Sequence, residues 1–312
     1  MTSAPTGESP GVEPFDLDGH LRQEARSVEA ALERSLDRIG GLISEPAAAA
    51  VSHGVLSGGK RLRPILCHAA YRAGGGLASD EQVYDLAVSL ELIHAYSLMH
   101  DDLPCMDDAE LRRGRPTTHR VHGEERTVWA GASLIPMATS QVLWAGERMG
   151  LGRQQAAEVA SLLLEAAGAG GMVGGQALDL LGEGRRLTAG ELDTLHRHKT
   201  GALLTAALTM GAAAAAAPAS IRSAMATYGQ AVGLAFQVAD DLLDVTATAE
   251  ELGKKPSDQE LAKSTYVALF GLEEARRRGN ALVSQAREAL LRAGVESRPL
   301  HALAEFVMSR RR

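Results

Sequence analysis

The sequence predicts an all-α protein, and three observations support this fold class. Alanine, leucine, glutamate and arginine dominate the chain with helical spacing. The chain has no alternating runs of valine, isoleucine, threonine and aromatic residues, which are typical of strands. Hydrophobic residues make up 45% and charged residues 23%, enough apolar surface for a core and too little charge for disorder. We therefore expect a globular helical protein.

The N-terminal segment differs in composition from the rest of the chain. Residues 1–15 carry three prolines and two glycines, and we expect them to form a mobile tail. Regular structure is expected to start near Asp16. The length of 312 residues is compatible with one or two domains, because the usual size of about 150 residues per domain is a soft guide.

A long, deeply packed helix is predicted over residues 80–101. Ser79 is its expected N-cap, and Gln82 stands at the position that completes a capping box. Pro104 follows the helix and would break it. Apolar residues recur along this segment at helical spacing, namely Val83, Leu86, Ala87, Leu90, Ile93 and Leu98.

Two later segments contain no charged residue and approach the length of a membrane span. These are residues 127–146 and 201–218. The first contains Pro136 and Gln141, and the second is mostly alanine and threonine, which are weakly apolar. We predict that both are helices buried in a protein core, the second stopping at Pro218 after a run of alanines.

The charge balance disfavours several classes of partner. The 39 acidic residues exceed the 32 Lys and Arg by 7, and aromatic residues make up 4%. No global positive field attracts nucleic acid or an anionic membrane, and base-stacking platforms are scarce. The two cysteines, Cys67 and Cys105, cannot form a disulfide framework, and no signal peptide is recognisable. We expect a cytoplasmic protein without a membrane span.

Four carboxylates crowd into residues 101–108, where the predicted helix ends. Such a cluster repels itself unless a cation is bound, and hard divalent ions with oxygen ligands are the usual partners. An EF-hand is excluded, because the loop lacks the glycine and the glutamate of that motif. A solvated acidic loop remains the alternative for this cluster taken alone.

A second acidic cluster follows some 140 residues later on an apparently apolar helix. Asp240 and Asp244 lie one turn apart on one face, and Asp241 is three residues from Asp244. Taken alone, this cluster is also compatible with a surface charge patch. Two such clusters together suggest facing walls of one cavity that hold several Mg²⁺ ions. Because Mg²⁺ prefers a few carboxylates plus phosphate oxygens, the implied ligand is a diphosphate.

Basic residues occur where a diphosphate would need them. Residues 58–64 combine two glycines with three cations, and residues 112–116 follow the first acidic cluster with three arginines. The first segment lacks the spacing of a Walker A loop. Solvated turns remain the alternative for each segment alone. The run at 196–201 contains two histidines, but zinc is disfavoured because further ligands at suitable spacing are missing nearby.

The combined motifs resemble the trans-isoprenyl diphosphate synthases of the polyprenyl synthetase family, and most of all the short-chain bacterial farnesyl diphosphate synthases. The resemblance runs from about Ala48 to the C-terminus. It implies a single-domain helical bundle of the isoprenoid synthase type over residues 16–312, built around a central apolar cavity. The motifs occur in family order: GGKRLRP at 58–64, ELIHAYSLMHDDLPCMDD at 91–108, LRRGRPTTH at 111–119, GGQALDL at 174–180, HKTGALL at 198–204, FQVADDLLD at 236–244, and the late Lys254 and Lys263.

The resemblance also implies a role for each site residue. Three Mg²⁺ ions would be held by Asp101, Asp102, Asp107, Asp240, Asp241 and Asp244. Isopentenyl diphosphate would be anchored by Lys60, Arg63, His94 and Arg113. The allylic diphosphate would be clamped by Arg112, Lys254 and Lys263, together with the catalytic residues Lys199, Thr200 and Gln237. The metals would neutralise the leaving diphosphate, so that an allylic cation forms and adds to isopentenyl diphosphate.

Product length should depend on the helix that precedes the first acidic cluster. Tyr96, with Ser97 beside it, would cap the cavity early, and a farnesyl (C15) product is expected. If Tyr96 instead faces a neighbouring helix, a geranylgeranyl (C20) product is the alternative. The family resemblance also implies a homodimer.

One segment departs from the family pattern. An aspartate usually follows the Ala-Gly pair that stands here at residues 130–131, whereas this chain has Ala132 and then Ser133, a candidate substitute helix cap. Activity is still expected, because both acidic motifs and the basic anchors are intact. The intact anchors disfavour a terpene cyclase, and a catalytically silent regulatory homologue is the remaining rival.

Overall fold

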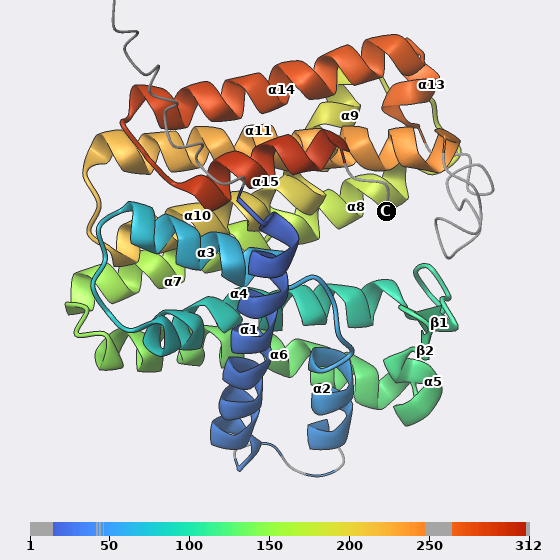
Figure 1. The fold of residues 1–312 in the computed structure, drawn as a ribbon. Helices are drawn as coiled ribbons and strands as arrows, with labels where there is room; N and C mark the ends of the chain where they lie inside the picture. The colour runs from blue at the N-terminus through green and yellow to red at the C-terminus, as the bar shows by residue number, and fades with distance from the viewer. Residues whose placement is uncertain (1–14, 42, 44, 46, 247–263, 310–312) are drawn as a thin grey trace, which may run out of the picture.

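The computed structural model describes residues 15–41, 43, 45, 47–246 and 264–309, and this part of the chain is almost entirely helical (Figure 1). The predicted all-α class is confirmed. Apart from Phe15, the expected tail lies outside the described residues, as do Lys254 and Lys263. The helices are α1 (Leu17–Gly40), α2 (Ala47–Val55), α3 (Leu62–Ala73), α4 (Asp80–Asp101), α5 (Thr118–His122), α6 (Glu124–Arg148), α7 (Arg153–Ala167), α8 (Met172–Gly182), α9 (Ala189–His196), the π-helical turn η1 (Arg197–Gly201), α10 (Ala202–Ala214), α11 (Ala219–Thr246), α13 (Tyr266–Phe270), α14 (Leu272–Arg292) and α15 (Arg298–Ser309).

Local capping explains where the first long helices begin. Helix α1 starts after Asp16, whose side chain accepts a hydrogen bond from the amide of Gly19. Helix α4 starts after Ser79, and the capping box with Gln82 is formed in both directions. The helix predicted over residues 80–101 is confirmed at both ends. It is buried on nearly all sides, so the aspartates at its C-terminal end follow directly from a helix in the protein interior.

A short hairpin follows α4 and was not expected from the sequence. Strands β1 (Leu111–Arg112) and β2 (Arg115–Pro116) pair in antiparallel fashion. Arg113 and Gly114 form the turn between them, and both have positive φ angles, 54° and 76°. Two-residue hairpins favour this conformation, which glycine adopts without strain. The hairpin is too short to show an alternating pattern, which is why period-2 analysis missed it.

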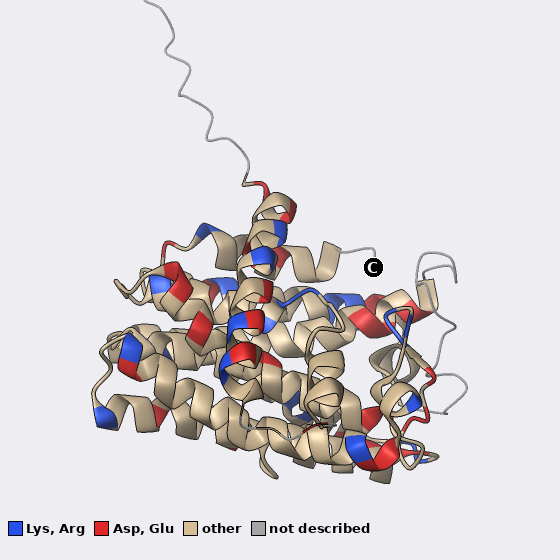
Figure 2. Cartoon of the chain, turned by 90° about the horizontal axis from the view of Figure 1, so that it is seen from below, with Lys and Arg blue, Asp and Glu red and all other residues tan. Residues whose placement is uncertain are grey.

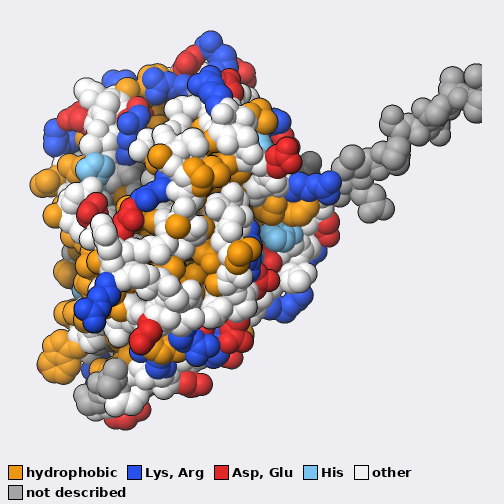
Figure 3. All heavy atoms as spheres, turned by 90° about the vertical axis from the view of Figure 1, so that its left-hand side faces the viewer, with side chains coloured by type: hydrophobic (Ala, Val, Ile, Leu, Met, Phe, Trp, Pro, Cys, Tyr) orange, Lys and Arg blue, Asp and Glu red, His pale blue; other side chains and the backbone are white. Residues whose placement is uncertain are grey.

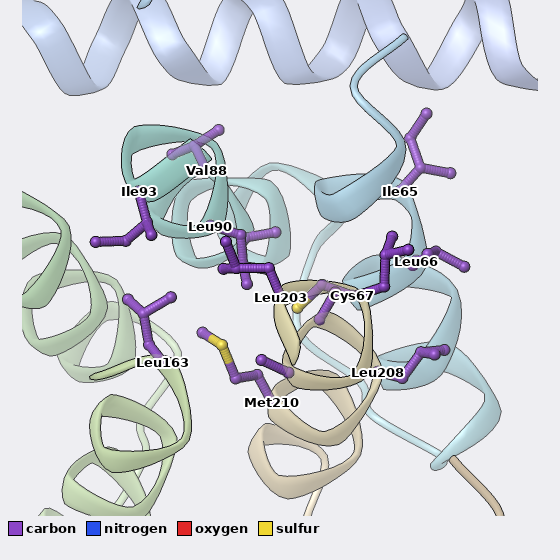
Figure 4. Close-up of a cluster of buried hydrophobic side chains, with 14 of the residues drawn as sticks. Ile65, Leu66, Cys67, Val88, Leu90, Ile93, Leu163, Leu203, Leu208 and Met210 are labelled. Carbon is purple, nitrogen blue, oxygen red and sulfur yellow. The ribbon is translucent and has the colours of Figure 1, made fainter. Parts of the chain in front are cut away.

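The main core lies where helices from distant parts of the chain meet. In Figure 1, α11, α14 and α15 lie on one side of α10, while α4 and α6 lie on the other and α1 crosses them steeply. Figure 4 shows aliphatic and sulfur side chains from α3, α4, α7 and α10 turned toward one another. They include Ile65, Leu66, Cys67, Val88, Leu90, Ile93, Leu163, Leu203, Leu208 and Met210.

The two uncharged segments are parts of α6 and α10. Helix α10 is buried along nearly its whole length, as predicted, and ends at Ala214, before Pro218. Helix α6 packs one face against α4 but leaves Val128, Trp129 and Leu143 exposed on the other. The prediction of a core helix is therefore correct for α10 and only half correct for α6.

One stretch of the described chain, Arg153–Gly182, is long and apolar enough to be considered as a membrane span. It comprises two helices, α7 and α8, which are 15 and 11 residues long and are separated by residues 168–171. A straight helix needs about 20 residues to cross a bilayer, so neither helix alone reaches that length.

The proposed capping role of Ser133 is wrong. Ser133 lies well inside α6, whose N-cap is Gly123, and its hydroxyl donates to the carbonyl of Trp129 one turn earlier. A side chain in mid-helix has no unpaired backbone amide to cap, because every amide there already bonds within the helix. The departure at Ala132 therefore leaves α6 unbroken.

Candidate active site

Two adjoining cavities contain most of the residues that the sequence singled out. The larger has a volume of about 730 Å³ and the smaller about 340 Å³, and Arg63, His94, Lys199 and Thr200 line both. The larger is also lined by Lys60, Arg113, Gln237, Asp240, Asp241 and Asp244. The smaller is also lined by Tyr96, Ser97 and Asp101, and by Met172, Val173, Ala177 and Leu180 of α8. The larger cavity thus has more of the charged residues, and the smaller one adds an apolar wall from α8.

Charged residues of both signs form one group at the end of the molecule that carries the hairpin. Figure 2 shows acidic and basic residues close together at the end that carries the β1–β2 hairpin. The face seen in Figure 3, at the other end, has hydrophobic atoms between scattered charged groups. Acidic and basic groups held together in a concave site suit an anionic ligand that is bound together with cations.

The first acidic cluster is split between different environments. Asp101 lines the smaller cavity, while Asp102 is buried and accepts hydrogen bonds from Arg112 at 2.8 and 2.9 Å. Asp107 is exposed, and its amide donates to the carbonyl of Asp101, so the chain folds back at this point. The structure therefore does not bring Asp102, Asp107 or Arg112 into the lining of either cavity.

The electrostatic setting of Asp101 favours a bound cation. Burial raises the pKa of Asp101 to about 6; Asp107 and Asp102 act in the same direction, and Lys199 opposes them. The ionised carboxylate is thus held in a place that disfavours it, because water is excluded and like charges are near. A metal ion would relieve this repulsion. Because Lys199 is close enough to lower the pKa of Asp101, the first acidic cluster lies near the segment 197–201 that contains Lys199.

The second acidic cluster occupies the last turns of α11. Asp240 and Asp241 line the larger cavity with Asp244, as the one-turn spacing predicted. Gln237 donates to Asp240 at 3.3 Å. Asp241 is 6% exposed and accepts a hydrogen bond from the backbone amide of Tyr266 at 2.6 Å. The start of α13 therefore orients one of the three carboxylates.

The basic loop before α3 is held by a buried ion pair network. Arg61 is 3% exposed and donates to Glu29 at 2.7 Å, to Glu91 at 2.8 Å and to the carbonyl of Val55. Its φ angle of 50° is left-handed, a strained conformation that costs about 1–3 kcal/mol in a residue other than glycine. These contacts to α1, α2 and α4 fix the loop, so that its neighbours Lys60 and Arg63 reach the larger cavity.

Two further arginines, Arg63 and Arg113, lie close together beside the loop. Arg113 donates to the carbonyl of Gly58, and it lies where a side chain at Gly59 would otherwise project. Burial lowers the pKa of Arg63, and Arg113 adds to that effect. Burial and the same two arginines also lower the pKa of His94 well below its usual value. A neutral His94 can form hydrogen bonds to an anion, while the arginines supply the charge.

A π-helical turn presents Lys199 and Thr200 to both cavities. Lys199 Nζ contacts Asp179 of α8 at 2.5 Å. Gly175 of α8 and Gly233 of α11 approach the backbone of η1 so closely that a β-carbon at either position would collide with it. Single π-helical turns are frequent at functional sites, because the extra residue changes where side chains project. Here the two glycines hold that turn between α8 and α11.

Replacing Gly175 with alanine is expected to move η1 and weaken both stability and activity. Overpacking of this kind typically costs about 1–3 kcal/mol of unfolding free energy. Turnover should fall as well, because the backbone of Lys199 must shift away from the new methyl group. Thermal unfolding and steady-state kinetics would measure both effects. Gly190→Ala on α9 is the control, since no atom lies within 4 Å of its β-carbon position.

Sequence reasoning missed several residues that shape this site. Residue spacing assigns no role to Asp179 and does not distinguish Arg61 from the other cations of its loop. Gln176 also lines the smaller cavity, with both its amide atoms buried and without a hydrogen-bond partner among the described residues. The partners of Arg61, half-buried Glu29 of α1 and buried Glu91 of α4, carried no local signal, because an ion pair between distant segments is not visible in residue spacing.

Comparison with known proteins identifies the family. The sequence model of the polyprenyl synthetases, described as "Polyprenyl synthetase", matches residues 45–293. The chain belongs to the polyprenyl synthetase family. Members of this family condense isopentenyl diphosphate with allylic diphosphates and depend on divalent metal ions. The polyprenyl synthetase resemblance drawn from the motifs is confirmed, and the protein is a trans-prenyltransferase.

Individual relatives cover nearly the whole chain. The farnesyl diphosphate synthase of Escherichia coli (strain K12) is 42% identical over 272 residues, which is 85% of this chain and 89% of that protein. The geranylgeranyl diphosphate synthase of Cyanophora paradoxa is 37% identical over 300 residues, 95% of this chain and 97% of that protein. The apo structure of an FPP/GFPP synthase from Zymomonas mobilis superposes with a TM-score of 0.81 at 31% identity, covering 94% and 99% of the two chains.

The donor set in the polyprenyl synthetase site suits hard divalent ions. All the acidic candidates supply carboxylate oxygens, the ligands that Mg²⁺ prefers. Among the described residues, no three His, Cys, Asp or Glu side chains lie close enough to hold an ion by themselves. An ion in this site would therefore need further oxygen ligands from water and from a diphosphate. This is how Mg²⁺ is usually bound beside phosphates.

Proposed function

We propose that this trans-prenyltransferase uses Mg²⁺, three ions in each active site, and makes farnesyl diphosphate as its main product. The observation that carries the proposal is the charged cavity that adjoins an apolar one behind Asp101. Carboxylates and cations in the first suit two diphosphates with their metals. The second suits a growing hydrocarbon tail, and Tyr96 stands in its wall.

The residues of the chain would divide the binding work between the two substrates. Lys60, Arg63, His94 and Arg113 would anchor isopentenyl diphosphate, because all four line the larger cavity and Arg63 and Arg113 lie near His94. The allylic diphosphate would be held by Lys199, Thr200, Gln237 and Arg112, and by Lys254 and Lys263, which are outside the described residues. The six aspartates of the two acidic clusters named above would hold the metals, and Asp102 is paired with Arg112.

The metals would supply electrostatic stabilisation of the departing diphosphate. The allylic C–O bond breaks, and its electron pair leaves with the diphosphate. The double bond of isopentenyl diphosphate then forms the new C–C bond with the allylic carbon. Loss of one proton to the released diphosphate restores a double bond in the product. Lys199, close to Asp101 and Asp179, would stabilise negative charge where the diphosphate departs.

The apolar cavity keeps water from the reactive cation. Its side walls come from Met172, Val173, Ala177 and Leu180 of α8 and from Tyr96 of α4. Water would convert an allylic cation to an alcohol, so exclusion of water is part of the chemistry. Ordinary acid–base side chains are not required for this step.

A farnesyl product is supported by the position of Tyr96, which lines the smaller cavity one turn before His100. The same ring also lies beside α6, with Cδ2 3.5 Å from the β-carbon position of Gly131. That second contact keeps geranylgeranyl diphosphate as the alternative product. A catalytically silent homologue is disfavoured by the intact acidic and basic residues in the larger cavity.

Replacing Tyr96 with alanine is expected to lengthen the main product by at least one isoprene unit. One isoprene unit is comparable to one helical turn of about 5.4 Å, so removing the ring opens room for another unit. Chromatography of the dephosphorylated products would measure the change. Ser97→Ala is the matched control, because the hydroxyl it removes bonds to the carbonyl of His94 and fills little space. An unchanged product length in Tyr96→Ala would show that Tyr96 does not close the end of the cavity.

We also expect a cytoplasmic homodimer. The exposed apolar residues Trp129 and Leu143 of α6, Leu164 of α7 and Leu181 of α8 support a surface that a second copy covers. Helices α6, α7 and α8 follow one another in packing contact, so these side chains belong to neighbouring elements. Apolar patches of this kind are typical of protein interfaces.

The direct test is product analysis with defined substrates. Purified protein would be incubated with Mg²⁺, isopentenyl diphosphate, and dimethylallyl or geranyl diphosphate. Conversion of either allylic substrate to farnesyl diphosphate is expected. A main product of twenty carbons would overturn the proposed chain length, and no elongation with either substrate would point to the silent homologue.

A further inference from the structure

The wall of the smaller cavity contains a second aromatic side chain next to Tyr96. His100 lies one turn further along α4 and lines the same cavity. The two rings meet edge to face, with centroids 4.6 Å apart and planes inclined at 68°. Edge-to-face contact of this kind is favourable, and each ring limits the rotamers that are open to the other.

The imidazole of His100 is also seated against α6. Its Nε2 lies 3.4 Å from the carbonyl oxygen of Val128. Gly131 lies one turn further along α6, and its missing side chain makes the space that the ring occupies. A β-carbon at position 131 would stand 2.5 Å from His100 Nε2 and 2.6 Å from its Cδ2. Contacts that short are not tolerated, so any side chain at position 131 must displace the ring.

The direction of that displacement is limited. The backbone of α6 blocks one side, and α4 and α6 are closely packed against each other along their lengths. Tyr96 blocks a second side. A ring displaced away from α6 would press on Tyr96 and on the volume of about 340 Å³ that both residues line.

We infer that His100, seated in the gap left by Gly131, is a specificity-determining residue that sets product length jointly with Tyr96. This inference rests on the proposed use of the smaller cavity for the growing tail. The depth of the cavity then depends on a contact between α4 and α6, and not on the side chains of α4 alone. Because Gly131 has no side chain, the His100 ring can stay against α6 and leave the cavity open.

Two substitutions test the inference in opposite directions. Gly131→Ala should push the ring inward and shorten the product, raising the ratio of geranyl to farnesyl diphosphate roughly tenfold or more. One methyl-sized change in an apolar pocket commonly discriminates by about 10-fold to 200-fold. His100→Ala should widen the cavity beside Tyr96 and raise the share of products longer than those of the unchanged protein by a similar factor.

The double variant supplies the decisive comparison. In His100→Ala the ring is gone, so adding Gly131→Ala should have little further effect on product length. Gly146→Ala is the matched control, because Gly146 is also a buried glycine of α6 and its β-carbon would meet neighbours at an ordinary 3.5 Å. This control should leave the product distribution unchanged.

Either of two results would overturn the inference. They are an unchanged product length in His100→Ala, or an equal shortening by Gly131→Ala whether or not His100 is present. If a variant turns over too slowly, calorimetric affinities for allylic diphosphates of increasing tail length give the same comparison without catalysis. A C20 product from the unchanged protein would overturn the proposed C15 assignment, while the relative shifts among variants would still decide the role of His100.

Discussion

Asp101→Asn is expected to make the metal-free protein more stable and the enzyme at least about 10²-fold slower. The stability gain follows from the pKa of Asp101, which burial raises to about 6 from an ordinary value of 3.8. A shift of this size corresponds to at most about 3 kcal/mol of unfolding free energy, because each pKa unit is worth about 1.4 kcal/mol. The slower turnover follows from the proposed part of Asp101 in holding a metal beside the departing diphosphate.

The sign of the pH dependence is fixed by the direction of the shift. The folded state holds the proton of Asp101 more tightly than the unfolded state does. The resulting stabilisation is fully present below about pH 4 and is lost as the pH rises through about 6. The metal-free asparagine variant should lack this component, so its advantage over the unchanged protein should appear above pH 6.

Thermal unfolding with a chelator, between pH 5 and 8, would measure the stability change, and steady-state assays with Mg²⁺ would measure turnover. Asp37→Asn is the matched control, because it removes the same charge from an exposed position on α1. A variant of Asp101 that is less stable at pH 8 without metal would contradict the assigned burial of its charge. Normal turnover would contradict its role in catalysis.

Asp241→Ala is expected to lower turnover roughly 10²-fold or more and also to destabilise the protein. The loss of activity follows from its proposed part in holding a metal beside the departing diphosphate. The loss of stability follows from the buried amide of Tyr266, which would lose its acceptor. A buried donor left without a partner costs about 1–3 kcal/mol.

The asparagine variant separates these two effects. In Asp241→Asn the side-chain oxygen can still accept from the Tyr266 amide, so stability should be largely retained while turnover stays low. Denaturant unfolding and initial rates of both variants would provide the comparison. Near-normal turnover in either variant would refute the assignment of Asp241 to the metal site.

Long helices and charged clusters were the features most open to prediction. The bounds of α4 followed from Ser79, Gln82 and a regular apolar spacing, because capping and periodicity are local properties. The shared face of Asp240 and Asp244 followed from helical geometry in the same way. The all-α class followed from composition over the whole chain.

Contacts between distant segments were not predictable in this way. Asp102 belongs to the same sequence cluster as Asp101, yet it is buried against Arg112 of the hairpin. Ser133 matched a capping residue by type, but its place in mid-helix depends on α6 continuing through it. Pairings such as Lys199 with Asp179 join different helices, and single-chain spacing contains no information about them.

The π-helical turn η1 has a consequence for how this site tolerates changes of chain length. Regular helices α9 and α10 flank it, so the deletion of one of its five residues would leave one continuous helical segment. Everything on one side of the deletion would nevertheless rotate by about 100° relative to the other side. Lys199 and Thr200 would then turn out of register with Asp179 and Asp101. Substitution in this segment changes one side chain, whereas deletion would misalign the whole wall.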